Sequence, residues 1–191
     1  FGVWHDCFQL CRLNDVKVTN NIFMNPLLLG TSPIYTDEQT QTDNGAHKVF
    51  TIDTLYEGAK FNFAANNIFW SQDVLDVLNG IDSVSIPNIY SDLIVQALGN
   101  DGSDTYIQEA ITLNNVPINL TQYVIDLYAN PASEEMFDFV VEDILFEGTA
   151  FDNGHLFDFS MFDPCYSPDT ESAKASTNGG AIGPTQTCAA L

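Results

Sequence analysis

The stretch VFTIDTLY, residues 49–56, decides the fold class that this sequence predicts. Apolar and polar side chains nearly alternate along it, which is the pattern of a half-buried β-strand. The ten residues Asp53–Asn62 resemble Asp143–Asp152 through the shared pattern D-x-L-[YF]-E-G-[AT]-x-F-[ND]. The two copies lie 90 residues apart, since Glu57 corresponds to Glu147. The resemblance predicts two related strand–turn–strand units, and chance agreement over ten positions is the alternative.

The first copy guides the interpretation of the second. Residues 136–145 fit either a helix or a strand, and the match to a clear strand favours a strand. Asn153-Gly154 then predicts a hairpin turn, because this pair tolerates positive φ at both central positions. Short apolar runs between Val16 and Ile34, and again over residues 105–129, predict further strands.

Two segments have helical periodicity and matched ends. The first spans residues 71–79, with Ser71 as its N-cap and Gly80 after its end. The second spans residues 91–98 and stops before Gly99. We therefore expect a mainly β protein, an antiparallel β-sandwich or jelly-roll-like domain with two short helices. An α+β fold, or two related β units of roughly 90 residues each, are the alternatives.

The charge excludes several classes of partner. The chain has 191 residues, with 26 Asp and Glu against 5 Lys and Arg, a formal net charge of −21 at pH 7. Nucleic acids and anionic lipids repel such a surface, so we expect no nucleic acid partner. No apolar run approaches the ~20 residues of a membrane span, so no membrane insertion is expected. Such acidity suits a saline, acidic or calcium-containing exterior, where self-repulsion is reduced.

Cysteines occur only near the two ends of the chain, at Cys7, Cys11, Cys165 and Cys188. Four cysteines allow three pairings. We expect two bridges between the N-terminal arm and the C-terminal segment, each closing a loop of more than ~150 residues and worth ~4–5 kcal/mol in chain-entropy terms. Such bridges require an oxidising compartment, and four buried free thiols are the alternative.

Three regions follow from the composition: residues 1–13, 14–165 and 166–191. The first is an apolar arm and the second a β-rich globular domain. The third is rich in Ser, Thr, Gly and Pro, so a disulfide or a neighbouring subunit is expected to hold it. The apolar side chains of the arm are candidates for a strand donated to another copy, namely Phe1, Val3, Trp4, Phe8 and Leu10.

Export is the expected localisation, secreted or at the cell surface. The chain begins with Phe1 rather than Met, which we interpret as removal of a secretory signal, an artificial start being the alternative. Asn119 begins the sequon Asn119-Leu120-Thr121 and is the glycosylation candidate. No cofactor is expected apart from a weakly indicated calcium ion, whose candidate ligands are Asp101, Asp104, Asp152 and Asp158.

The leading hypothesis is a secreted structural subunit of an extracellular filament, pilus or surface layer, which binds copies of itself through the N-terminal arm. No nucleophile or phosphate-binding motif is present, so we do not expect an enzyme. An extracellular module that binds carbohydrate or another ligand is the first alternative, with Trp4 and Trp70 as aromatic candidates. A secreted hydrolase is the second, with carboxylates such as Glu57 and Glu147 as its pair.

Overall fold

In the part of the chain that the structure describes, all strand pairs within the sheets are parallel. The computed structural model describes residues 8–10, 15–28, 30–31, 48–82, 84–116, 120–129 and 163–183. In these residues the strands form three small sheets, with the orders β1-β4-β7, β2-β5 and β3-β6-β8. The predicted antiparallel sandwich or jelly roll is therefore wrong. An antiparallel fold assumes that strands close in sequence pair through hairpins. In this structure each strand pairs with a strand 40 or more residues away.

The chain runs through the sheets in three successive passes. The first pass contains β1 (Phe8–Leu10), β2 (Asp15–Thr19) and β3 (Ile22–Met24). The second contains β4 (Lys48–Ile52), β5 (Lys60–Ala64), β6 (Asn66–Phe69) and helix α2 (Gln72–Asn79). The third contains β7 (Asn88–Tyr90), helix α3 (Asp92–Leu98), the 3₁₀ turn η2 (Ser103–Thr105), β8 (Tyr106–Ile107) and helix α4 (Leu120–Ala129).

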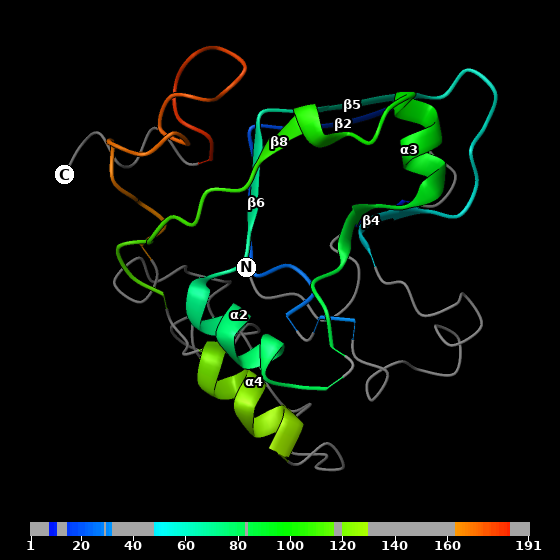
Figure 1. Cartoon of the computed structure of the whole chain (residues 1–191). Coiled ribbons are helices and arrows are strands. Elements are labelled where there is room, and N and C mark those ends of the chain that lie inside the picture. Colours follow the sequence, from blue (N-terminus) through cyan, green and yellow to red (C-terminus); the bar gives the residue numbers. More distant parts are fainter. Residues whose placement is uncertain are drawn as a thin grey trace, which may run out of the picture.

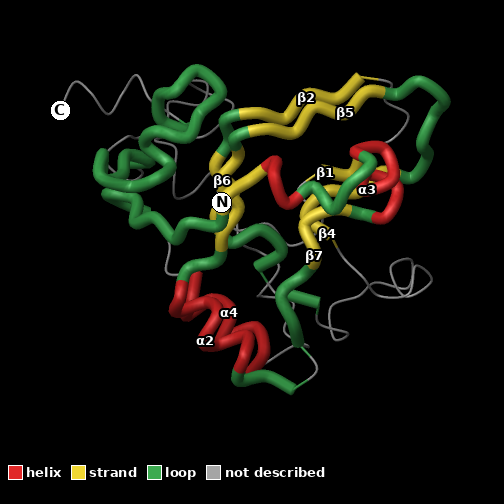
Figure 2. The backbone as a smooth tube through the Cα atoms, turned by 45° about the horizontal axis from the view of Figure 1, so that its top comes forward, coloured by secondary structure: helices red, strands yellow, loops and turns green. Residues whose placement is uncertain are grey.

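Each pass lies beside the one before it at a nearly constant offset. Phe8 pairs with Phe50 and Val16 with Phe61, offsets of 42 and 45 residues. Phe50 pairs in turn with Tyr90, an offset of 40 residues, and the offset from β6 to β8 is also 40. Figure 2 shows β2 running along β5, and β4 and β7 together beside β1. Stacking of successive passes in this way is the organisation of a β-solenoid, in which each repeat buries its face against its neighbours.

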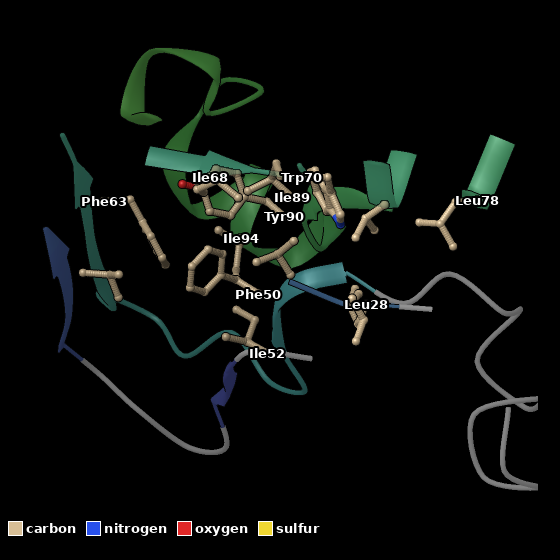
Figure 3. Close-up of a cluster of buried hydrophobic side chains, with 14 of the residues drawn as sticks. Leu28, Phe50, Ile52, Phe63, Ile68, Trp70, Leu78, Ile89, Tyr90 and Ile94 are labelled. Carbon is tan, nitrogen blue, oxygen red and sulfur yellow. The ribbon is translucent and has the colours of Figure 1, made fainter. Parts of the chain in front are cut away.

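An aromatic cluster joins the three passes in the core. Phe50 of β4 is fully buried, and its ring lies 5.3 Å from that of Phe63 and 5.7 Å from that of Tyr90, between ring centroids. Phe23 of the first pass meets the Phe50 ring edge-on at 5.0 Å. Figure 3 shows Phe50 in the middle of this cluster, with Ile94 of α3 on one side. Burial of such rings is the main favourable contribution to the stack.

Helices α2 and α3 confirm the sequence prediction. Ser71 and Ser91 are the N-cap residues, although neither hydroxyl makes a capping hydrogen bond. Gly99 ends α3 in the left-handed conformation, with φ of 76°. The strand predicted over residues 49–56 is also present, but it ends at Ile52 and a turn follows.

The prediction of strands through residues 105–129 is wrong for its larger part. Among the described residues of this range, β8 is the only strand that belongs to a sheet, and Leu120–Ala129 form α4, a helix that was not expected. Helix α4 packs against α2, and the Thr121 hydroxyl donates a hydrogen bond to the Asp73 carboxylate. These two helices follow β6 and β8 respectively, so they continue the stacking of the second and third passes (Figure 1). Tertiary contact has here overridden the β propensity of the sequence.

Candidate functional site

A long segment near the C-terminus lies across the stacked passes. We call residues 163–183 the strap; they are drawn orange to red in Figure 1, beside β6 and β8. The strap has no helix or strand longer than an isolated bridge in the residues described. It nevertheless makes hydrogen bonds to all three passes. Within the described residues this polar cluster brings together side chains that are remote in sequence, so we take it as the candidate functional site.

The third pass holds the strap through a carboxylate. Glu109 follows β8, and its side-chain oxygens accept hydrogen bonds from the backbone N–H groups of Glu171 (2.8 Å) and Ser172 (2.7 Å). The Ser172 hydroxyl donates a third bond at 2.7 Å. Burial raises the pKa of Glu109, but the bonds from Ser172 and Glu171 outweigh it and leave the pKa below its usual 4.5. Charge-assisted bonds of this kind are stronger than neutral ones.

The second pass contributes a buried amide. Asn67 in β6 is fully buried, and its side-chain nitrogen donates to the Ser172 hydroxyl and to the Glu109 carbonyl, both at 2.8 Å. Its side-chain oxygen accepts from the Glu109 backbone N–H at 3.1 Å. Both protons of the amide nitrogen and one of the two lone pairs of the oxygen are thus engaged. Asn67 therefore fixes Glu109 and Ser172 together on the edge of the second pass.

The first pass receives the far end of the strap. The Asn20 side chain accepts a bond from the Thr177 backbone N–H at 2.8 Å and donates to the Thr177 hydroxyl at 3.0 Å. The Gly183 backbone N–H donates to the Asn20 carbonyl at 3.0 Å. Gly183 has a φ of 81°, a conformation that favours glycine, and a Cβ atom there would lie 2.7 Å from the terminal methyl group of Ile22, which would have to shift. The anchors Asn20, Asn67 and Glu109 lie one on each pass.

The strap is also closed on itself. The Ile182 backbone N–H donates to the Ser172 carbonyl at 2.8 Å, and the Tyr166 hydroxyl donates to the Ile182 carbonyl at 2.6 Å. Ile182 and Ser172 are fully buried. The residues between them therefore form a compact loop whose ends meet, as in an Ω-loop. Burial raises the pKa of Tyr166, so its hydroxyl stays a donor over the working pH range.

The base of the strap has its own attachment. Asn115 and Asp163 exchange two backbone hydrogen bonds of 3.1 Å, and the Asn114 N–H donates to the Cys165 carbonyl at 2.7 Å. Cys165 is disulfide-bonded. The other cysteines, Cys7, Cys11 and Cys188, lie outside the described residues, so the pairing stays a prediction.

Two of the four predicted calcium ligands, Asp101 and Asp104, lie among the residues that the structure describes. The Asp101 carboxylate accepts bonds from the backbone N–H and hydroxyl of Ser103, which lower its pKa and make an ordinary turn. Asp104 is exposed beside it, while Asp152 and Asp158 lie outside the described residues. Within the described ranges, no three His, Cys, Asp or Glu side chains gather where they could hold a metal ion.

Other predicted site residues have mixed outcomes. Asn119 lies outside the described residues, and so do Phe1, Val3 and Trp4 of the arm. Residues 8–10 of the arm, with Phe8 and Leu10, form β1 and pair with β4 of the same chain. Among the helices described, none is both long and apolar enough to cross a lipid bilayer.

The sequence does carry a signal for the stacked passes and for two of the anchors. The tetrapeptide Asn-Asn-Ile-Phe occurs at residues 20–23 and again at residues 66–69. Its offset of 46 residues differs by one from the 45-residue register between β3 and β6. Two of the three anchors, Asn20 and Asn67, belong to these tetrapeptides. A search for sequence repeats spaced by 40–50 residues therefore detects the spacing of the parallel strands, which the comparison of segments 90 residues apart did not detect.

Comparison with models of protein families, with curated proteins and with solved structures finds no match to this chain. Function is therefore argued from the geometry alone. The Ser172 hydroxyl is buried between a carboxylate and an amide, with no access for a substrate. This arrangement fastens the strap to the stack and has no geometry for catalysis by Ser172.

Proposed function

We propose that this protein is a secreted structural subunit, whose stacked passes form a rigid scaffold within an assembly of copies of itself. The observation that carries the proposal is the strap, which crosses the stack and bonds to Asn20, Asn67 and Glu109 on three successive passes. A segment that ties repeats together side by side resists their separation along the stack. The acidic surface and the disulfide at Cys165 support a location outside the cell.

The proposed contact between copies is the apolar arm ahead of β1. Strand β1 is an outer strand in the sheet order β1-β4-β7 of the described residues, and residues 1–7 directly precede β1 in the sequence. Sheet edges pair readily with strands of other molecules. The apolar side chains Phe1, Val3 and Trp4 would then bury against the neighbouring copy.

The oligomeric state of the full chain tests the proposal. We expect light scattering after size exclusion to show oligomers that grow with concentration, and electron microscopy to show their form. The double variant Val3→Ser/Trp4→Ser should be smaller at every concentration, because it removes apolar area from the contact. Tyr56→Ser is the matched control, since Tyr56 is exposed on a turn of the second pass. A wild-type chain that stays monomeric throughout contradicts the proposal.

The two alternative functions gain nothing from the described residues. Trp70 is buried, and its indole N–H donates to the Pro26 carbonyl at 2.7 Å, so it is not an open platform for a sugar ring. Asp53 and Glu57 are exposed at a turn, and their counterparts in the second copy lie outside the described residues. We therefore keep the structural role as the proposal.

A further inference from the structure

We propose that the strap is a proton-controlled clasp: protonation of the Glu109 carboxylate frees residues 171–183 from the stack while the stack itself stays folded. This inference concerns one hydrogen-bonded cluster within a single chain. It goes beyond the structural role proposed above and does not depend on it. The geometry of Glu109 carries it.

Glu109 acts at the strap only as an acceptor. Its carboxylate receives three donors, the N–H groups of Glu171 and Ser172 and the Ser172 hydroxyl. An ionised carboxylate offers about four lone-pair sites, so it can satisfy all three at once. A protonated carboxyl carries a hydrogen on one of its oxygens, so it has fewer acceptor sites than the carboxylate. That hydrogen also faces N–H and O–H groups that already point at the carboxyl. Protonation therefore removes at least one of the three bonds and weakens the others from charge-assisted to neutral.

The strap and the stack are held by different forces. The stack is held by a buried apolar core that includes Phe50, Phe63 and Tyr90, and protons do not change that contribution. Beyond Cys165, the described strap buries little apolar surface apart from Ile182. Its bonds to the passes are polar, so it belongs to the least stable part of the molecule. Loss of the Glu109 bonds thus acts on the strap first.

Neutral groups surround most of the Glu109 side chain. Asn67 of β6 and Ser172 of the strap are uncharged, and the chain neighbours of Glu109 are Gln108 and Ala110. Tyr166 is the titratable group of the described strap that interacts with Glu109, whose charge adds to burial in raising the tyrosine pKa. The strap side chains of Asp169, Glu171 and Lys174 are exposed.

The pH range follows from the sign of the Glu109 shift. The folded pKa lies below the usual 4.5, even though burial opposes the bonds from Ser172 and Glu171. A group with a lowered folded pKa stabilises the folded form above its unfolded pKa, and this contribution disappears as the pH falls through the folded pKa. The clasp is therefore closed at neutral pH and opens only below the usual value. The general repulsion from the net charge of −21 diminishes over the same range, which favours an intact stack.

Hydrogen exchange of the intact, oxidised chain tests the clasp. Peptides covering residues 171–183 are compared with peptides covering β5 and β6, at pH 7 and at about pH 3.5, after correction for the intrinsic exchange rate. We expect protection of the strap to fall several-fold at the lower pH, up to the limit of about tenfold that one carboxyl can supply there, while the strands keep their protection within about twofold. Glu109→Gln imitates the protonated carboxyl, so the same loss should occur in this variant at pH 7.

Two further arms keep the interpretation specific. Asp101→Asn is the matched control, because Asp101 also has a lowered pKa but bonds to Ser103 of its own turn. It should leave strap protection unchanged. Lys174 is exposed in the strap, so endoproteinase Lys-C at pH 8 should cut after it faster in Glu109→Gln than in the wild type. The clasp is refuted if strap and strands lose protection together at low pH, or if a folded Glu109→Gln protein keeps wild-type strap protection.

Discussion

Replacing Asn66 by alanine should remove the main polar link between the first and second passes. Asn66 is fully buried at the start of β6. Its side-chain nitrogen donates to the Val18 carbonyl at 2.9 Å. Its side-chain oxygen accepts from the Asn21 backbone N–H at 3.1 Å and from the Asn21 side chain at 3.3 Å. One amide therefore satisfies backbone groups on β2 and at the bend that follows it.

The expected cost follows from these partners. Asn66→Ala breaks the bonds to the Val18 carbonyl and the Asn21 N–H, each worth about 1 kcal/mol net. The Val18 carbonyl is then left buried without its partner, which adds about 1–2 kcal/mol. Asn21 is exposed, so water can replace part of its loss. The sum is a decrease of about 2–4 kcal/mol in the free energy of unfolding, a large share of the 5–15 kcal/mol typical of a domain.

Urea unfolding followed by tryptophan fluorescence measures this decrease, with the m-value checked for constancy. Asn21→Ala is the matched control. It removes the side-chain bonds of Asn21 to Thr19 and Asn66 but keeps the backbone N–H that bonds to Asn66. Its cost should stay under about 1 kcal/mol because the side chain is exposed. The reasoning is wrong if Asn66→Ala changes stability by less than about 0.5 kcal/mol, or if Asn21→Ala costs as much.

Three other predictions concern turns, helix contacts and charge. Gly102→Ala should destabilise the protein by about 2–3 kcal/mol, because its φ is 74° and its Cβ would lie 2.6 Å from the Tyr90 ring. Gly58→Ala is the control, with a φ of 80° but open space around it, and it should cost only about 1–2 kcal/mol. Equal decreases in stability in urea unfolding would contradict the argument from the Tyr90 contact. The hydrogen bond from Thr121 lowers the pKa of Asp73, so Thr121→Val should raise that pKa in an NMR titration and reduce stability at neutral pH. This difference in stability should disappear as the pH falls through the pKa of Asp73 in the wild-type protein. The net charge of −21 should make the melting temperature at pH 7 rise with NaCl, and a melting temperature independent of salt would show that self-repulsion is unimportant.

Local signals in the sequence were sufficient where the contacts are local. Helices α2 and α3 lie between a serine and a glycine, and their apolar residues recur at helical spacing, so both were predicted at nearly their true bounds. Strand β4 was predicted from alternation alone. Its end at Ile52 was missed, since Asp53–Tyr56 continue a strand-like pattern while the chain already turns. Segment boundaries of this kind depend on neighbours that a periodic pattern does not contain.

The strap could not be predicted as an ordered part of the chain from its own residues. Its Ser, Thr, Gly and Pro content is typical of a flexible tail, and that inference led to an expected disulfide or neighbouring subunit as its support. Its described part also bonds to Asn20, Asn67 and Glu109 of its own chain, and these contacts were not predicted. Asn20 lies 157 residues from its partner Thr177. Asn67 and Glu109 lie 105 and 63 residues from their common partner Ser172. No local pattern records contacts at such separations.

The sequence by itself determined the two early helices, the presence of strands and the formal net charge of −21, because each depends on composition or on spacing within a few residues. Only the tertiary structure decided that the strands pair in parallel, that residues 120–129 are helical and that the strap crosses three passes. The physical reason is that alternation states which face of a strand is buried but not which strand lies beside it. In this chain the partner lies 40–45 residues away, where burial of the shared core fixes the pairing.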